Sequence, residues 1–236
     1  MGVGNEEMRF SPEERQSLAA YAASARWPAG FTVYQRGAAA DGVFVVLSGH
    51  VVLRTRLKGG RAFVPAVVRV GELFGTEGLT AGALYHTDAR ADAESQTLHL
   101  GRLRLQTLLR ERPDLGLSLL AQIGRANAAL LDRLRELAAL SVEQRLLAAV
   151  SRAATARADG GADAPVVFDA AGYRLLCEMV GATRESVSLV VNRLVTEGVA
   201  ARDGSTVSIH PPRSFPASAE RLLGHALAGS EEQVAS

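Results

Sequence analysis

Residues 175–194 read LLCEMVGATRESVSLVVNRL, and this stretch predicts a helix, a tight turn at Gly181 and a second helix. Apolar side chains recur at helical spacing on both sides of the turn, so each helix can bury one face against the other. These side chains are Leu176, Met179, Val180, Val187, Val190, Val191 and Leu194. The pattern is typical of a helix-turn-helix.

The other face of the second helix is largely polar. Thr183 is placed to cap this helix and to leave the amides of its first turn for a phosphate. Arginine can read guanine edges and glutamate can accept from the cytosine amino group, so Arg184 and Glu185 suit base recognition. The predicted DNA-contacting residues are Thr183, Arg184, Glu185, Ser186, Ser188, Leu189 and Asn192, together with Tyr173 and Arg202. Helix-turn-helix shapes also serve protein interaction, so an adaptor that does not bind DNA is the alternative.

The residues after this motif predict a wing. Residues 197–209 read EGVAARDGSTVSI, which predicts two short strands about the turn Asp203-Gly204. We therefore assign residues 141–212 to a winged helix-turn-helix domain. In the tail, residues 213–236, we expect a short helix over 219–228 and six disordered residues at the end.

A long helix is predicted upstream, beginning at Pro113. Alternating spacings of four and three, typical of a coiled-coil seam, relate Ile123, Asn127, Leu130, Leu134 and Leu137. We expect residues 113–140 to form a dimerisation helix and hinge, with the hinge near 138–141 and the protein a homodimer. A second helix should follow from Val142 to about Arg157. The alternative is that the seam is one face of an internal bundle.

Short runs of β-branched and aromatic residues fill the segment from Trp27 to about Leu100, punctuated by glycines. Such runs predict a sandwich or barrel-like roll. The preceding Ser11-Pro12-Glu13-Glu14 predicts a capping box that opens a short helix reaching Ala25. We therefore expect residues 1–112 to form a β-roll sensor domain with flanking short helices, and the whole chain to be of the α+β class.

The amino-acid composition of the chain excludes several classes of function. The 236 residues are 47% hydrophobic, enough for a packed core, and 26 basic residues nearly cancel 25 acidic ones, so the DNA assignment depends on motif. A single cysteine, Cys177, excludes an internal disulfide and a cysteine-rich zinc or iron–sulfur site, and we expect it to be buried. No apolar run approaches the ~20 residues that span a bilayer, and no signal peptide is evident, which favours the cytoplasm. We find no catalytic motif and predict no enzyme activity, metal or membrane partner.

The order of these parts resembles the Crp-Fnr superfamily of bacterial regulators. The motifs that carry the resemblance are PAGF at 28–31, YQRG at 34–37, DGVFVVLSG at 41–49, GELFG at 71–75 and GATRESV at 181–187. The resemblance implies a cyclic-nucleotide-binding-type roll, a dimer seam and two recognition helices that enter successive major grooves of a two-fold symmetric operator. It also implies that Arg184 and Glu185 occupy two of three base-contacting positions, the third being Leu189. The implied partners are double-stranded DNA, a second copy of the chain and RNA polymerase.

The effector site departs from the resemblance. Cyclic-AMP-responsive relatives place a glutamate for the ribose and an Arg-Ser pair for the phosphate where this chain has Thr76 and His86-Thr87. Histidine and threonine cannot form the charged bidentate fork that a phosphate favours. The candidate ligand-pocket residues are Gly75, Thr76, Glu77, His86 and Thr87, with Leu130 and Leu131 at the positions expected to contact the adenine.

We therefore expect no control by cyclic AMP and assign no cofactor. Other possible inputs are an unidentified ligand, no ligand at all, a cyclic nucleotide held by Glu77, or a haem on His50, His86 or His99.

Overall fold

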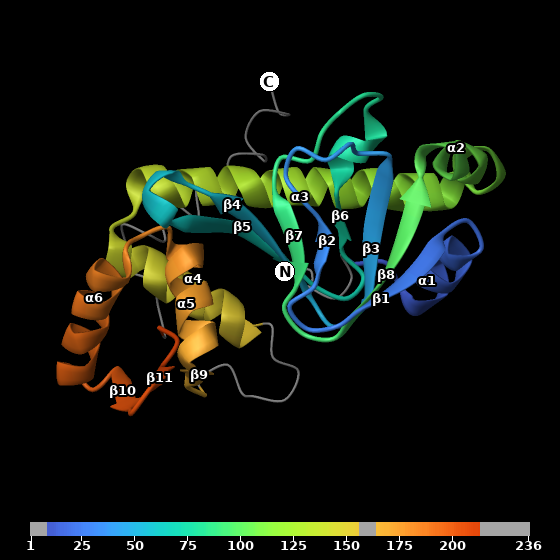
Figure 1. Ribbon diagram of the computed structural model, residues 1–236. Helices are drawn as coiled ribbons and strands as arrows, with labels where there is room; N and C mark the ends of the chain where they lie inside the picture. The colour runs from blue at the N-terminus through green and yellow to red at the C-terminus, as the bar shows by residue number, and fades with distance from the viewer. Residues whose placement is uncertain (1–8, 156–163, 213–236) are drawn as a thin grey trace, which may run out of the picture. The chain divides into compact units, whose positions relative to one another are not determined.

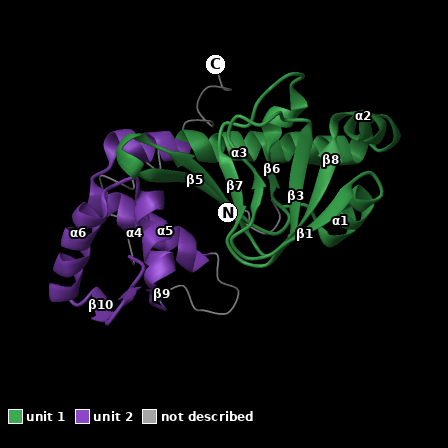
Figure 2. Ribbon diagram, in the orientation of Figure 1, with its two compact units in different colours: residues 1–131 green, residues 132–236 purple. Residues whose placement is uncertain are grey.

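The computed structural model describes residues 9–155 and 164–212. The chain divides into two compact units, residues 1–131 and 132–236, which we call the roll unit and the helix-turn-helix unit (Figures 1 and 2). The end of the helix expected near Arg157, most of the loop after it and the whole expected tail lie outside the described residues.

The roll unit contains two four-stranded antiparallel sheets. The first has the order β1(Ala23–Trp27), β8(Ser95–Gly101), β3(Gly42–Ser48), β6(Leu73–Phe74). The second has the order β2(Thr32–Tyr34), β7(Asp88–Ala91), β4(Val51–Arg56), β5(Ala62–Val68). Two 3₁₀ turns, η1(Lys58–Gly60) and η2(Thr76–Leu79), connect strands. The predicted β-roll is confirmed.

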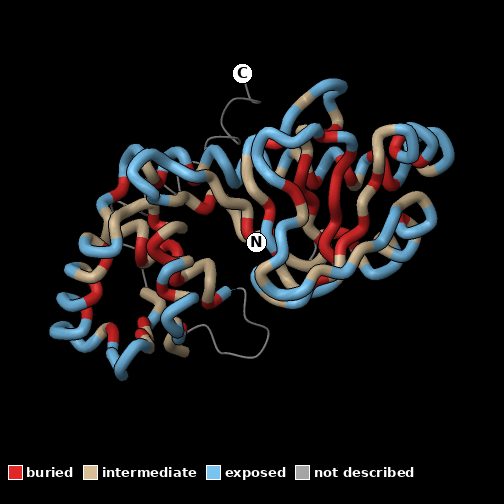
Figure 3. The backbone as a smooth tube through the Cα atoms, in the orientation of Figure 1, coloured by how far each residue is buried: buried red, intermediate tan, exposed pale blue. Residues whose placement is uncertain are grey.

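Strand β3 shows why its sequence is a continuous apolar run. Val43 and Val45 join a core with the flanking helices, while Phe44 and Val46 join a second core against the other sheet. Alternate residues of a strand point to opposite faces, so a strand buried on both faces needs apolar residues at every position. The buried stretches of the roll strands appear in red in Figure 3.

Three helices begin within the roll unit: α1(Pro12–Ala19), α2(Arg102–Glu111) and α3(Pro113–Ala139). The predicted capping box of α1 is confirmed, because the Ser11 hydroxyl accepts from the Glu14 amide and the Glu14 carboxylate accepts from the Ser11 amide. The prediction that this helix reaches Ala25 is wrong. Residues 23–27 form β1 and pair with β8, so strand pairing overrides the helix propensity of the alanines.

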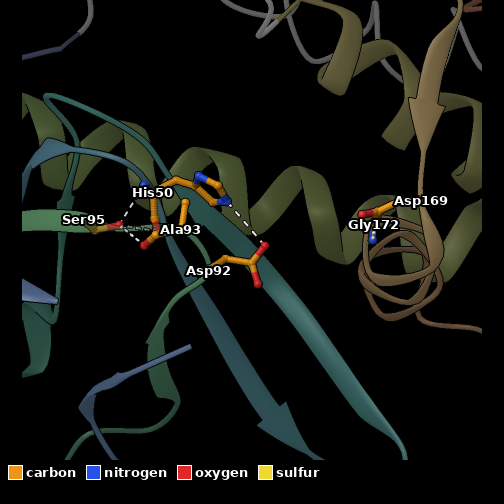
Figure 4. A network of polar contacts seen from close by, with 6 residues as sticks. All are labelled: His50, Asp92, Ala93, Ser95, Asp169 and Gly172. Carbon is orange, nitrogen blue, oxygen red and sulfur yellow. Dashed lines mark hydrogen bonds and ion pairs between the residues drawn. The ribbon is translucent and has the colours of Figure 1, made fainter. Parts of the chain in front are cut away.

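The turn between β3 and β4 is fixed to the turn that follows β7. Gly49 has φ +70°, and a Cβ there would lie 2.3 Å from the carbonyl oxygen of Glu94. The Ser95 hydroxyl accepts from the His50 amide at 3.1 Å and lies 2.8 Å from the Ala93 carbonyl oxygen (Figure 4). Only glycine suits this backbone geometry and close approach, which explains Gly49 in the 41–49 motif.

The helix-turn-helix unit contains α4(Val142–Thr155), β9(Val166–Phe168), α5(Ala170–Val180), α6(Arg184–Thr196), β10(Ala200–Asp203) and β11(Thr206–Ile209). Asp169 caps α5 by accepting from the Gly172 amide at 2.7 Å (Figure 4), and Gly181 ends the helix with φ +69°. The wing strands β10 and β11 pair about Gly204, and β9 adds a third strand. The predicted winged helix-turn-helix fold is confirmed.

The last turns of α3 belong to this unit. Glu136 is buried and forms ion pairs with Arg133 and Arg152, and Arg133 also donates to the Met179 carbonyl near the end of α5. Helix α3 ends at Ala139, and Ser141 and Gln144 exchange capping hydrogen bonds at the start of α4. The helix break lies where the hinge is expected, whereas the division between the units falls earlier, after residue 131.

Candidate functional site

The start of α6 is built as the sequence predicts. The Thr183 hydroxyl accepts from the Ser186 amide at 3.2 Å, and the Thr183 carbonyl accepts from the Val187 amide. The amides of Arg184 and Glu185, the first two helical residues, have no acceptor one turn earlier within the helix. These amides and the positive end of the helix dipole are suited to an anion.

The outer face of α6 is exposed above a buried core. Val187, Val191 and Leu194 are buried with Leu176 and Val180 of α5. Most of the predicted DNA-contacting side chains lie on the opposite side, where Arg184, Glu185, Leu189 and Asn192 are exposed and Thr183, Ser186 and Ser188 are partly exposed. Leu189 is 72% exposed on this face. Buried and exposed residues alternate along α6 in Figure 3.

Tyr173 does not lie on this exposed face. Its side chain is buried under α6, and its hydroxyl lies 3.3 Å from the Ser188 hydroxyl. Arg202 of β10 donates to both hydroxyls, at 3.5 and 3.4 Å, and its guanidinium lies 5.6 Å from the centroid of the Tyr173 ring. Its ring helps to fill the core and only its hydroxyl reaches the polar face, and a direct DNA contact from Tyr173 stays a prediction.

Cys177 is buried in the same core, as expected. Burial raises the pKa of its thiol above the usual value, while Arg184 has a smaller opposite effect. A buried thiol that favours its neutral form suits packing and makes a poor nucleophile or redox sensor.

Helix α3 carries an exposed apolar stripe. Its members recur at alternating spacings of three and four: Leu117, Leu120, Gly124, Asn127, Leu131 and Leu134. Of the predicted seam residues, Asn127 and Leu134 belong to this stripe, Leu130 flanks it and Leu137 is half-buried. Ile123 is partly buried against the roll core that contains Leu115 and Leu119, and its place in the seam stays a prediction. The predicted seam and the exposed stripe both have coiled-coil spacing in the sequence. Only the packing of α3 on the roll shows which residues are exposed.

The candidate ligand-pocket residues are only partly brought together. Glu77 of η2 accepts from the His86 amide at 3.1 Å, and its carboxylate also lies 3.5 Å from the His86 ring, which is itself exposed. Thr76 and Thr87 are half-buried, whereas Leu130 and Leu131 are 45% and 50% exposed. A carboxylate at the His86 amide would repel an anionic phosphate at that position.

Aromatic rings fill the interior of the roll beside Gly75. Tyr34 and Tyr85 stack with centroids 3.7 Å apart, and Phe44 and Phe74 stack at 5.1 Å. A Cβ on Gly75 would lie 3.1 Å from the Phe44 ring and 3.4 Å from each tyrosine ring. Burial is the main cause that raises the pKa of Tyr34, so its hydroxyl stays neutral. The residues next to Gly75 thus form a packed aromatic core.

The three histidines considered for haem each lie beside a carboxylate. His50 lies 3.4 Å from Asp92 (Figure 4), His86 lies beside Glu77, and His99 lies 3.2 Å from Asp41 while it stacks on Phe44. Within residues 9–155 and 164–212, no cluster of three or more histidine, cysteine or acidic residues could hold a metal ion.

Comparisons with known proteins agree with this architecture. Residues 25–112 match the family model of the cyclic nucleotide-binding domain. The "CRP-like cAMP-activated global transcriptional regulator" of Mycobacterium tuberculosis is 25% identical over 187 residues, which cover 78% of this chain and 82% of that protein.

Solved structures have a similar fold. The "c-di-GMP Responsive Global Regulator CLP" of Xanthomonas campestris matches with a TM-score of 0.71 and 21% identity, covering 86% of this chain and all of that one. TTHA1359 of Thermus thermophilus, described as a transcriptional regulator of the CRP/FNR family, matches with a TM-score of 0.66 and 23% identity over 79% of this chain and 93% of that one.

The match to the cyclic nucleotide-binding domain and the similarity to transcription regulators together support a DNA-binding regulator. The chain thus resembles the Crp-Fnr family in its matched domain, its curated relative and its fold. No enzyme family is indicated. Among the residues that the structure describes, no helix is long and apolar enough to cross a membrane.

Proposed function

We propose that the protein acts as a homodimer on a two-fold symmetric operator in the cytoplasm and inserts α6 into the major groove of each half-site. The observation that carries this proposal is the exposed outer face of α6, which begins with a capped, anion-binding turn and continues with Arg184 and Glu185. An arginine that donates two hydrogen bonds to a guanine contributes ~1–3 kcal/mol of discrimination. Leu189 offers only apolar contact, for example to a thymine methyl.

The exposed stripe of α3 supports the dimer. Leucines 117 and 120 are 69% and 63% exposed and continue the heptad spacing toward Leu131. An apolar stripe of this kind on a helix is stabilised when a second helix covers it. Gly124 and Asn127 lie within the stripe, where a small residue permits close approach and a polar one favours a single register.

Cyclic AMP is not the effector in this proposal, although a relative is named as cAMP-activated. His86 stands where a phosphate-binding arginine is expected, the Glu77 carboxylate occupies the His86 amide, and aromatic rings pack beside Gly75. We expect isothermal titration calorimetry to show no binding of cyclic AMP at tens of micromolar. Saturable binding that raises DNA affinity would overturn this part. RNA polymerase is proposed as a partner only because the resemblance to Crp-Fnr regulators implies it.

The experiment that tests the main proposal is selection of genomic fragments by the purified full-length protein, followed by sequencing. The expected result is enrichment of a two-fold symmetric site whose half-sites are about one helical turn apart, centre to centre. Arg184→Ala should bind the same fragments with reduced selectivity. Absence of any enriched sequence would favour the adaptor alternative.

A further inference from the structure

Arg202 carries a charge that its surroundings do not neutralise. Its side chain is exposed on wing strand β10, and within the described ranges 9–155 and 164–212 no carboxylate oxygen lies within 4 Å of its guanidinium. Its polar contacts are two neutral hydroxyls, those of Tyr173 and Ser188. By contrast, Arg193 on the same unit pairs with Glu143 and Glu197.

The contacts of Arg202 restrain its guanidinium but use only some of its N–H donors. Both hydroxyls are reached by one terminal nitrogen, Nη2, and the Tyr173 ring lies 5.6 Å from the guanidinium carbon. A guanidinium has five N–H donors, so the donors on the other two nitrogens remain available for an anion such as a phosphate. The buried Tyr173 ring and the helical Ser188 fix the contacts on the core side of Arg202.

This arrangement places the arginine beside the recognition helix. Ser188 lies one turn after Arg184 on α6, and residues four apart share a helix face. Arg202, however, comes from the wing, so it borders the reading face from the β10 side and does not project from the first turn. When a helix enters the major groove, the groups that border it meet the sugar–phosphate backbone.

We propose that Tyr173 and Ser188 hold Arg202 so that it binds a DNA backbone phosphate in each half-site, and that Arg202 does not read a base. This inference rests on the proposed function, because it requires α6 to occupy the groove. Tyr173 is then a positioning residue for the wing arginine, and it connects α5, α6 and β10 through a single hydroxyl.

The test measures operator affinity of the full-length protein against salt concentration for Arg202→Ala. Each lost phosphate contact makes the slope of log K against log salt shallower by about 0.9, or about 1.8 for the two protomers of a dimer. The affinity advantage of the unmodified protein should therefore be about 12-fold larger at 50 mM salt than at 200 mM. Base preferences should not change, and Arg202→Lys should restore most of the slope.

The positioning role is tested with Tyr173→Phe, which keeps the ring and removes the hydroxyl. The expected loss is about two- to tenfold per half-site on all sequences, as for one hydrogen bond in each protomer. In an Arg202→Ala background the same change should have no further effect. An equal loss in both backgrounds would mean that the Tyr173 hydroxyl acts independently of Arg202, and would overturn this role.

Arg184→Ala is the matched control, since it removes an arginine that we assign to base reading. It should alter preference at one base pair of each half-site. If Arg184→Ala behaves in this way while Arg202→Ala leaves the salt slope unchanged, or shifts preference at a base pair, the inference about Arg202 is wrong and the proposed function stands. If the unmodified protein selects no DNA sequence, the proposed function itself is wrong.

Discussion

Replacement of Glu136 by alanine should destabilise the helix-turn-helix unit strongly. Glu136 is 4% exposed and lies between Arg133, whose side chain is 10% exposed, and Arg152. Removal of the carboxylate would take away the acidic group that the buried Arg133 and the partly buried Arg152 share. Breaking a buried ion pair in this way costs about 3–5 kcal/mol. A loss of this size should lower the unfolding midpoint of a unit of about 100 residues by more than roughly 10 °C.

Asp132→Asn supplies the matched control on the same helix. Asp132 pairs with Arg135 at 3.0 Å, but both side chains are at least half exposed, so the change should cost no more than ~1 kcal/mol. The double variant Arg133→Met with Glu136→Leu should recover most of the Glu136→Ala loss, since apolar residues of similar volume can replace a buried pair.

Hydrogen exchange followed by mass spectrometry measures the loss of stability within the helix-turn-helix unit itself. Amides of α5 and α6 should exchange much faster in Glu136→Ala than in the unmodified protein. Their exchange rates should be almost unchanged in Asp132→Asn. Equal exchange in the two variants would refute the reasoning that burial makes the Glu136 network stronger than the exposed pair.

Two further predictions concern the dimer and the cysteine. Leu120→Asp should convert the dimer to a monomer at micromolar concentration and abolish operator binding. Leu103→Asp, at a 79% exposed leucine of α2 outside the stripe, should do neither. Sedimentation velocity that shows monomers for the unmodified protein would contradict the proposal that the stripe forms the dimer interface. Cys177 should react with a thiol reagent at pH 8 far more slowly in the folded than in the unfolded protein, because burial raises its pKa and so lowers its thiolate fraction at any given pH; equal rates would show that the thiol is accessible.

Features governed by neighbouring residues in the chain could be predicted from the sequence. The capping box at Ser11, the Thr183 cap, the turn at Gly181 and the wing turn at Gly204 are all found where the residue types favour them. Each depends on hydrogen bonds or backbone conformations within a few residues, so the local sequence contains the required information.

Features that depend on distant residues could not be predicted in the same way. Residues 23–27 form a strand because β8, some seventy residues later, supplies its partner. Ile123 packs against the roll core, and the Tyr173 ring lies inside the core between α5 and α6. The pairing of Glu136 with Arg152 joins two helices across the break at residues 140–141, and no spacing rule within one helix predicts it.

Recognition of the operator through the outer face of α6 is tested most directly by one measurement. Affinities of the unmodified protein and of Arg184→Ala are determined for a series of operators, each carrying one substituted base pair per half-site. We predict that the unmodified protein loses ~1–3 kcal/mol per half-site at one guanine, and that Arg184→Ala binds the original and substituted operators equally at that position. Unchanged base preferences in Arg184→Ala would contradict the account.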